Sequence, residues 1–194
     1  MIRQRPLPYE QLLAHRSLDQ VDLLVIHCTE LPDLATARQF GEKILYPAAD
    51  NRVPAPDDSL GTGNSGHYYI DRDGSIEQWV SNARIAHHVR SYNPRSIGIE
   101  LVNRGRYPHW FHANHQQMTE PYPQLQVAAL VQLVNVLQES LPELRWIAGH
   151  AELDMERVAA SNDASIMIQR KLDPGPLFPW PQVLASCRLQ RFQP

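Results

Sequence analysis

The stretch VDLLVIHC (residues 21–28) decides the fold class, because it is a β-branched, apolar run that ends in polar side chains. Such a run is typical of a buried strand. Two further stretches read the same way. SIGIELVN (residues 96–103) alternates in strand fashion, and WIAGH (residues 146–150) is short and apolar. The first and third strands carry a histidine at their ends, so we expect chemically active side chains at one edge of a sheet.

Helical and hairpin patterns lie between these strands. Residues 123–141 repeat apolar side chains at helical spacing, and residues 34–45 also fit a helix. HYYI (residues 67–70) and SIEQW (residues 75–79) flank DRDG, whose Asp-Gly pair predicts a hairpin turn. Residues 46–66, rich in Pro, Asp, Gly and Asn, predict a long loop. The mixed order predicts an α/β fold, a single domain with a central mixed β-sheet flanked by helices.

Length and composition limit the function classes. At 194 residues the chain suits one domain, which we expect to have a core at about residues 20–185, an N-terminal extension at 1–19, and loop excursions at 104–122 and 152–169. A net charge of -3 gives no reason to expect nucleic acid as a partner. No span approaches the roughly 20 apolar residues of a membrane helix.

The N-terminal residues show no signal peptide. We therefore expect a cytoplasmic protein, or a periplasmic or envelope protein if a leader was removed. Cys28 and Cys187 could form at most one bridge and lack metal-type spacing, which agrees with a reducing compartment.

The segment KLDPGP (residues 171–176) places a cation and a carboxylate two residues apart. Pro174 favours an extended Asp173, so Lys171 and Asp173 should project to the same side. The chain has only two lysines against sixteen arginines, which makes this lysine notable. One interpretation is a surface ion pair, a contact that contributes roughly 0 to 1 kcal/mol. The other is chemistry at a functional site.

The histidines at the strand ends favour the second interpretation. His27 and His150, together with Asp173, make a set of two nitrogens and one oxygen. A catalytic zinc commonly takes such a set and keeps a fourth position for water. Either histidine alone would more often be a structural or surface residue. As a set, the three residues predict a zinc site in a cleft at the strand ends.

Glu100 is the candidate general base. It lies on the strand face opposite Ile97, Ile99 and Leu101, among small or apolar neighbours, so it is either enclosed or an ordinary solvent-facing strand residue. Enclosure raises the pKa of a carboxylate toward the range useful for proton transfer. Lys171 is the candidate partner of a developing oxyanion.

The chain carries four motifs in this order: IH (26–27), SIGIE (96–100), AGH (148–150) and KLDPGP (171–176). With these motifs it resembles the zinc-dependent N-acetylmuramoyl-L-alanine amidases of type 2, a superfamily that includes the peptidoglycan recognition proteins. The resemblance covers roughly residues 20–185. It implies a single amidase domain with one Zn²⁺ per chain, held by His27, His150 and Asp173. It further implies Glu100 as general base and Lys171 as stabiliser of the tetrahedral intermediate.

The implied substrate is peptidoglycan or a muropeptide, cut at the amide between N-acetylmuramic acid and L-alanine. The N-acetylmuramic acid could be in its 1,6-anhydro form, as in recycling, or belong to intact peptidoglycan. Nothing in the resemblance implies an obligate protein partner. The candidate substrate contacts are His67, Tyr68, His88, Asn93 and Trp110.

Several alternatives remain open. Either His87 or His88 could line the cleft, and Trp110 could form a groove wall. The 152–169 segment is either a lid or a surface excursion. A non-catalytic peptidoglycan-binding module is the alternative function, although such members typically lose a zinc ligand and all three candidates are present here. An unrelated zinc peptidase would need a helical HExxH pair, which the chain lacks.

Overall fold

The computed structural model describes residues 1–47 and 61–194 and shows a seven-stranded mixed sheet. Its seven strands form six neighbouring pairs, and five of these pairs are parallel. The one antiparallel pair, β5 with β6, is the expected hairpin around DRDG. The strand order across the sheet is β1 (Ile2–Gln4), β6 (Ile76–Gln78), β5 (Tyr68–Ile70), β7 (Ser96–Leu101), β2 (Leu23–Cys28), β8 (Trp146–Gly149) and β11 (Gln190–Arg191).

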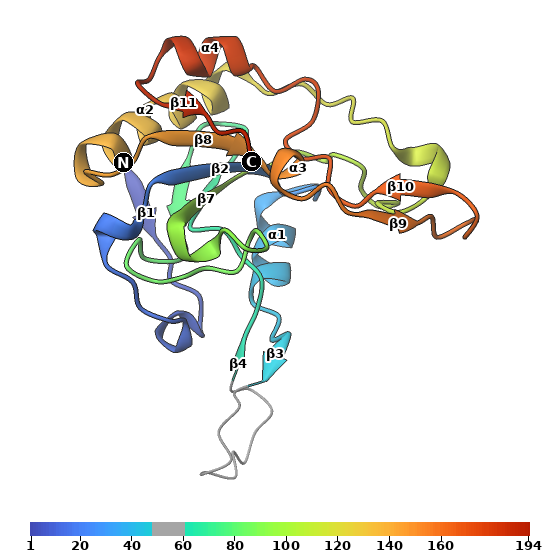
Figure 1. Cartoon of the computed structure of the whole chain (residues 1–194), viewed down its shortest axis with the longest axis horizontal. Helices are drawn as coiled ribbons and strands as arrows, with labels where there is room; N and C mark the ends of the chain where they lie inside the picture. Colours follow the sequence, from blue (N-terminus) through green and yellow to red (C-terminus); the bar gives the residue numbers. More distant parts are fainter. Residues whose placement is uncertain (48–60) are drawn as a thin grey trace.

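Helices cover both faces of this sheet (Figure 1). The 17-residue α2 (Gln124–Ser140) and the short α4 (Trp180–Ala185) pack on one face, and α1 (Leu34–Gly41) packs on the other. The short α3 (His150–Leu153) follows β8 directly. Single 3-10 turns lie at Glu10–Leu12, Leu18–Gln20, Asn93–Arg95 and Ala113–His115. No helix in the described ranges is long and apolar enough to cross a bilayer.

The alternation of side chains along β2 decides which face carries the core and which the site. Leu24, Ile26 and Cys28 belong to the large apolar cluster beneath α2, so Cys28 packs in the core. Leu23 and Val25 point to the other face, where they form a smaller cluster. Strand side chains alternate with period two, so His27 shares the face of Leu23 and Val25. The site is therefore built on the face opposite α2.

Four boundaries differ from the sequence-based expectations. The N-terminal residues 1–19 are not a mere extension, because β1 pairs with β6, and the last residues beyond 185 contribute β11. The helix expected over 34–45 ends at Gly41, since the backbone of Leu45 hydrogen-bonds to Thr62. The loop expected over 46–66 begins and ends in the short pair β3 (Tyr46–Pro47) and β4 (Gly61–Thr62), and its residues 48–60 lie outside the described part.

The two excursions lie beside each other at one side of the sheet (Figure 1). The 152–169 segment is not a plain loop, because β9 (Arg157–Ala159) and β10 (Met167–Gln169) form an antiparallel hairpin. Its turn contacts the 104–122 segment: the Ser161 amide donates to the Phe111 carbonyl at 2.7 Å, and the Ala113 amide donates to Asn162 at the same distance. We call this 152–169 segment the hairpin insertion.

Candidate metal centre and catalytic cleft

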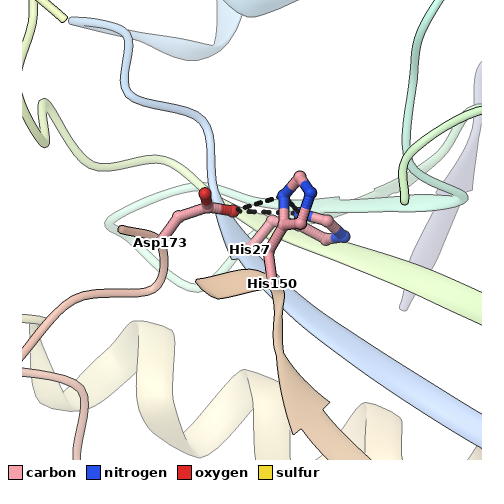
Figure 2. A group of neighbouring side chains, drawn as sticks. All are labelled: His27, His150 and Asp173. Carbon is pink, nitrogen blue, oxygen red and sulfur yellow. Dashed lines mark hydrogen bonds and ion pairs between the residues drawn. The ribbon is translucent and has the colours of Figure 1, made fainter. Parts of the chain in front are cut away.

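Three chain segments bring His27, His150 and Asp173 together, as expected from the sequence (Figure 2). His27 lies at the carboxyl end of β2. His150 comes directly after β8, whose Gly149 is the register partner of Ile26. Asp173 arrives from the segment after β10, and its carbonyl accepts a hydrogen bond from the Ala151 amide at 2.9 Å. Adjacent parallel strands thus place both histidines at the carboxyl-end edge of the sheet, and the KLDPGP segment adds Asp173 as the third member of the group.

The donor atoms of this group form a nearly equilateral triangle. The Nδ1 atoms of His27 and His150 lie 3.0 Å apart, and Asp173 Oδ2 lies 3.0 Å from the first and 3.1 Å from the second. All three residues are at most 3% exposed. A tetrahedral zinc with ligands at about 2.0–2.1 Å separates its donor atoms by roughly 3.3 Å. The triangle is therefore close to the size that zinc requires.

Hydrogen bonds behind His27 assign the tautomer that a metal ligand needs. The Ser96 hydroxyl donates to the Tyr92 carbonyl at 2.8 Å, so its oxygen accepts from His88 Nε2 at 3.2 Å. His88 Nδ1 then accepts from His27 Nε2 at 3.0 Å. This chain leaves His27 Nδ1 without a proton, facing the other two donors. Second-shell partners of this kind orient ligands and fix their tautomers.

The electrostatics of the group agree with cation binding. Burial, together with nearby His150, lowers the pKa of His27 to about 4, which keeps the ring neutral at pH 7. Burial alone would raise the pKa of Asp173, but the facing His150 and His27 hold it well below its usual range. The other carboxylate oxygen, Asp173 Oδ1, is buried without a hydrogen-bond partner in the described structure. Three donor atoms that face one another at 3.0 to 3.1 Å can share one cation, so the residues fit a metal ion.

Glu100 stands beside this group. It is the register partner of His27 on β7, and its Oε1 lies 3.9 Å from His27 Nδ1. Burial and the neighbouring Asp173 raise the pKa of Glu100 to about 8, as the enclosed interpretation requires. A side chain at Gly66 would come within 2.8 Å of Glu100 Cγ, so glycine there leaves room for the carboxylate. The geometry suits a proton acceptor next to the candidate metal position.

Lys171 lines the same cleft, on a segment fixed by a buried arginine. The Arg106 guanidinium pairs with Glu30 in bidentate fashion at 2.7 and 2.8 Å. It also donates to the carbonyls of Gln169 and Arg170, the two residues before Lys171. The 104–122 excursion therefore holds the start of the KLDPGP segment in place.

The cleft measures about 570 Å³. Among the candidate substrate contacts, His88 and Asn93 line it, and His87 lines it as well. Asn93 accepts hydrogen bonds from the backbone amides of His88 and Val89 at 3.0 and 2.8 Å, so it shapes the turn that carries His88. His88 itself contacts the metal-binding group through His27, which gives it a positioning role.

The structure does not bring His67, Tyr68 or Trp110 to the lining of this cleft. His67 is fully buried: its Nδ1 accepts from the Gly98 amide at 3.0 Å, and its Nε2 lies 3.1 Å from the Arg84 carbonyl. Tyr68 is buried as well, and its hydroxyl donates to the Asn82 side chain. Trp110 Nε1 donates to the Glu30 carbonyl at 2.9 Å. Their ring atoms contribute to packing.

Sequence reasoning missed several residues of the site. Ser96 completes the hydrogen-bond chain to His27. It lies on the same face of its strand as Gly98 and Glu100, and this alternation could have indicated that Ser96 faces the site. A side chain at Gly98 would come within 2.6 Å of the His88 ring, so glycine there lets the ring lie against β7. Arg90 and Arg170, which also line the cleft, had no local signal because no motif contains them.

Fold and site together define a class of protein, a single α/β domain with a mixed sheet and a candidate catalytic metal centre at the strand ends. A sequence profile described as N-acetylmuramoyl-L-alanine amidase matches residues 17–176. The chain belongs to this N-acetylmuramoyl-L-alanine amidase family. The match confirms the family and the enzyme class expected from the sequence: hydrolysis of the amide between N-acetylmuramic acid and L-alanine.

Individual relatives agree with this assignment. The 1,6-anhydro-N-acetylmuramyl-L-alanine amidase AmpD of Haemophilus influenzae is 26% identical over 179 residues, which is 87% of this chain and 83% of that protein. The amidase AmiD of Escherichia coli is 37% identical over 91 residues, 47% of this chain and 27% of that one. The structure of the amidase LysC from Clostridium intestinale URNW has the same fold, with a TM-score of 0.61, 16% identity, and coverage of 98% of this chain and 99% of that one.

Proposed function

We propose that the chain is a zinc-dependent amidase that cleaves 1,6-anhydro-N-acetylmuramyl-L-alanine in muropeptides, with one Zn²⁺ held by His27, His150 and Asp173. The observation that carries the proposal is the triangle of donor atoms, 3.0 to 3.1 Å on each side, with Glu100 beside it. A zinc ion bound there would act as a Lewis acid toward the scissile carbonyl and lower the pKa of its water toward about 7.

The protein's own groups perform the proton transfers. Glu100, whose pKa is raised to about 8, accepts the proton of the attacking water. It then returns that proton to the alanine nitrogen, so the amine leaves uncharged. The Lys171 ammonium stabilises the negative charge that develops on the carbonyl oxygen. His88 keeps His27 in its ligand tautomer throughout, because its Nδ1 accepts the His27 Nε2 proton.

The anhydro form of the substrate is supported by the name of the H. influenzae relative, which covers most of both chains. Intact peptidoglycan is the competing substrate. Mass spectrometry of products from anhydro-muropeptides and intact sacculi, offered side by side, distinguishes the two. Cleavage restricted to the anhydro form supports the proposal, whereas release of stem peptides from sacculi at a comparable rate contradicts the preference.

The alternative function expected from the sequence is a non-catalytic binding module. Against it stand the complete ligand set and the raised pKa of Glu100, which a binding protein does not need. Product formation by the zinc-loaded protein decides between them. The cytoplasmic location expected from the sequence stays a prediction, tested by cell fractionation.

A further inference from the structure

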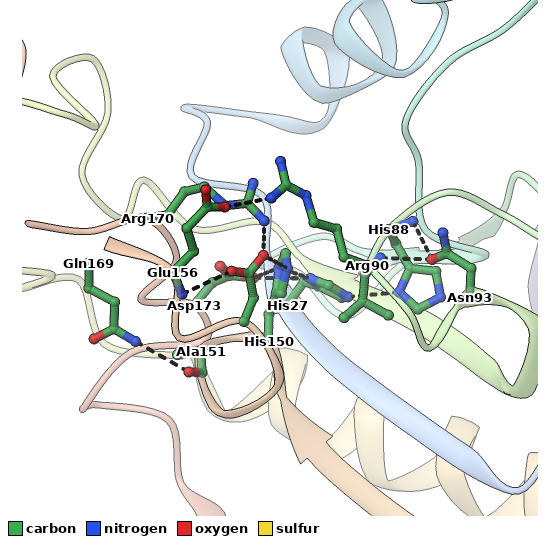
Figure 3. Close-up of polar contacts among 12 residues, drawn as sticks. His27, His88, Arg90, Asn93, His150, Ala151, Glu156, Gln169, Arg170 and Asp173 are labelled. Carbon is green, nitrogen blue, oxygen red and sulfur yellow. Dashed lines mark hydrogen bonds and ion pairs between the residues drawn. The ribbon is translucent and has the colours of Figure 1, made fainter. Parts of the chain in front are cut away.

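Two arginines from separate segments hold the same carboxylate at the rim of the catalytic cleft (Figure 3). Arg90 follows the turn that carries His88, and its Nη1 donates to Glu156 Oε2 at 2.5 Å. Arg170 immediately precedes Lys171, and its Nε lies 2.9 Å from the same Glu156 oxygen. Both arginines line the cleft that contains the metal-binding group. Glu156 belongs to the hairpin insertion.

The two guanidinium groups differ in how firmly they are held. Arg170 is 19% exposed in its side chain and also pairs with the buried carboxylate of Asp154. Its backbone amide donates to the Glu156 carbonyl at 2.8 Å. Arg90 is 68% exposed in its side chain, and Glu156 is the only ion-pair partner it has among the described residues. Arg170 is therefore fixed in position, and Arg90 is tied to it through Glu156 alone.

The Glu156 carboxylate is readily exchanged for another. Its side chain is 46% exposed, and an exposed pair of this kind contributes only about 0 to 1 kcal/mol. Guanidinium groups bind carboxylates through short, charge-assisted hydrogen bonds, and a single carboxylate between two of them can contact both. A ligand carboxylate that enters the cleft can replace Glu156 between the two arginines, because the displaced Glu156 side chain is 46% exposed and can be solvated.

We propose that Arg90 and Arg170 form a carboxylate subsite for the stem peptide and that Glu156 occupies it until substrate binds. The inference rests on the proposed function. Arg170 is adjacent to Lys171, and both line the same cleft, so we place the carboxylate on the stem-peptide side of the scissile bond. An extended peptide advances about 3.3–3.6 Å per residue, which places the second stem residue about 7 Å from that bond. The substrate bound to the E. coli amidase AmiD carries D-γ-Glu at this second position, so we assign the subsite to the free α-carboxylate of such a residue.

The test compares two muropeptides that differ in one group, a free α-carboxylate or an α-amide at the second residue. We expect the wild-type zinc enzyme to cleave the carboxylate form with a kcat/KM about 10–100-fold higher. Arg90→Gln should bring this ratio close to one, chiefly through KM for the carboxylate form. Glu156→Gln should lower the KM for the carboxylate form, because it removes the competing group.

Arg157→Gln is the matched control. Arg157 lies on β9 of the same hairpin insertion, is exposed, and donates to the Met167 carbonyl. We expect this variant to keep the wild-type ratio, and thermal unfolding of each variant checks that the fold is retained. Equal cleavage of both muropeptides by wild type overturns the subsite and leaves the proposed function standing. The subsite is equally refuted if Arg90→Gln keeps the full ratio. Cleavage of neither muropeptide by wild type refutes the proposed function itself.

Discussion

Replacement of His88 by leucine should weaken zinc binding without removing any metal ligand. In the structure His88 Nδ1 accepts the His27 Nε2 proton at 3.0 Å, and His27 is 2% exposed. Leucine leaves that N–H buried without an acceptor, which costs about 1–3 kcal/mol. It also frees the ring to take the other tautomer. Loss of a second-shell partner typically lowers metal affinity about 10–100-fold, or roughly 1.4–2.7 kcal/mol.

The assay is a competition titration against a chromogenic zinc chelator, which gives the zinc Kd of each variant. His88→Leu should raise the Kd about 10–100-fold. His88→Gln, which keeps an acceptor, should recover part of the loss. The matched control is His87→Leu, at the neighbouring position whose ring packs edge-on against Tyr46 and has no contact with His27 among those described, so its Kd should stay near wild type.

Two results would refute this reasoning. One is a His88→Leu protein with wild-type zinc affinity and an unchanged melting temperature, since the tautomer would then not depend on His88. The other is an equal loss of affinity in His88→Leu and His87→Leu, because that outcome would trace the effect to the shape of the loop.

Four further predictions concern the remaining groups of the site. Glu100→Gln should keep zinc and lose about 10²–10⁴-fold in kcat, measured by product formation and metal analysis of one sample. Asp173→Ala should lose both zinc and activity, and zinc content equal to wild type would contradict the ligand assignment. Lys171→Met should lower kcat about 10²–10³-fold with zinc retained, so an unchanged kcat would remove the lysine from the mechanism. Arg106→Leu should lower the free energy of unfolding by about 3–5 kcal/mol, because Glu30 stays buried without its partner. Chemical denaturation measures this loss, and a loss below about 1 kcal/mol would argue against a buried ion pair between Arg106 and Glu30.

Much of the fold was determined by local pattern. The apolar run at 21–28, the alternation at 96–103, the Asp-Gly turn and the helical spacing at 123–141 each specify an element through periodicity, and all four elements are present. The expected metal-binding residues also followed from local rules, because polar residues that end parallel strands meet at one edge of a sheet.

The tertiary structure decided which of several histidines serve the site. His67 and His88 both lie near strands, yet His67 is held by Gly98 and Arg84 in the interior, whereas His88 supports His27. These partners are 17 to 61 residues apart in the sequence. Nothing in a local pattern records such distances.

The same reason explains the strands at the two ends of the sheet and the arginine pair at the cleft. β1 pairs with a strand more than 70 residues later, and Arg90 and Arg170 meet only because the hairpin insertion places Glu156 between them. The sequence by itself determined the central strands, the long helix, the family and the candidate metal-binding residues, since periodicity and motif chemistry are local properties. Only the tertiary structure decided the hydrogen-bond partners of those residues and the charges at the cleft rim, because packing of distant segments sets both.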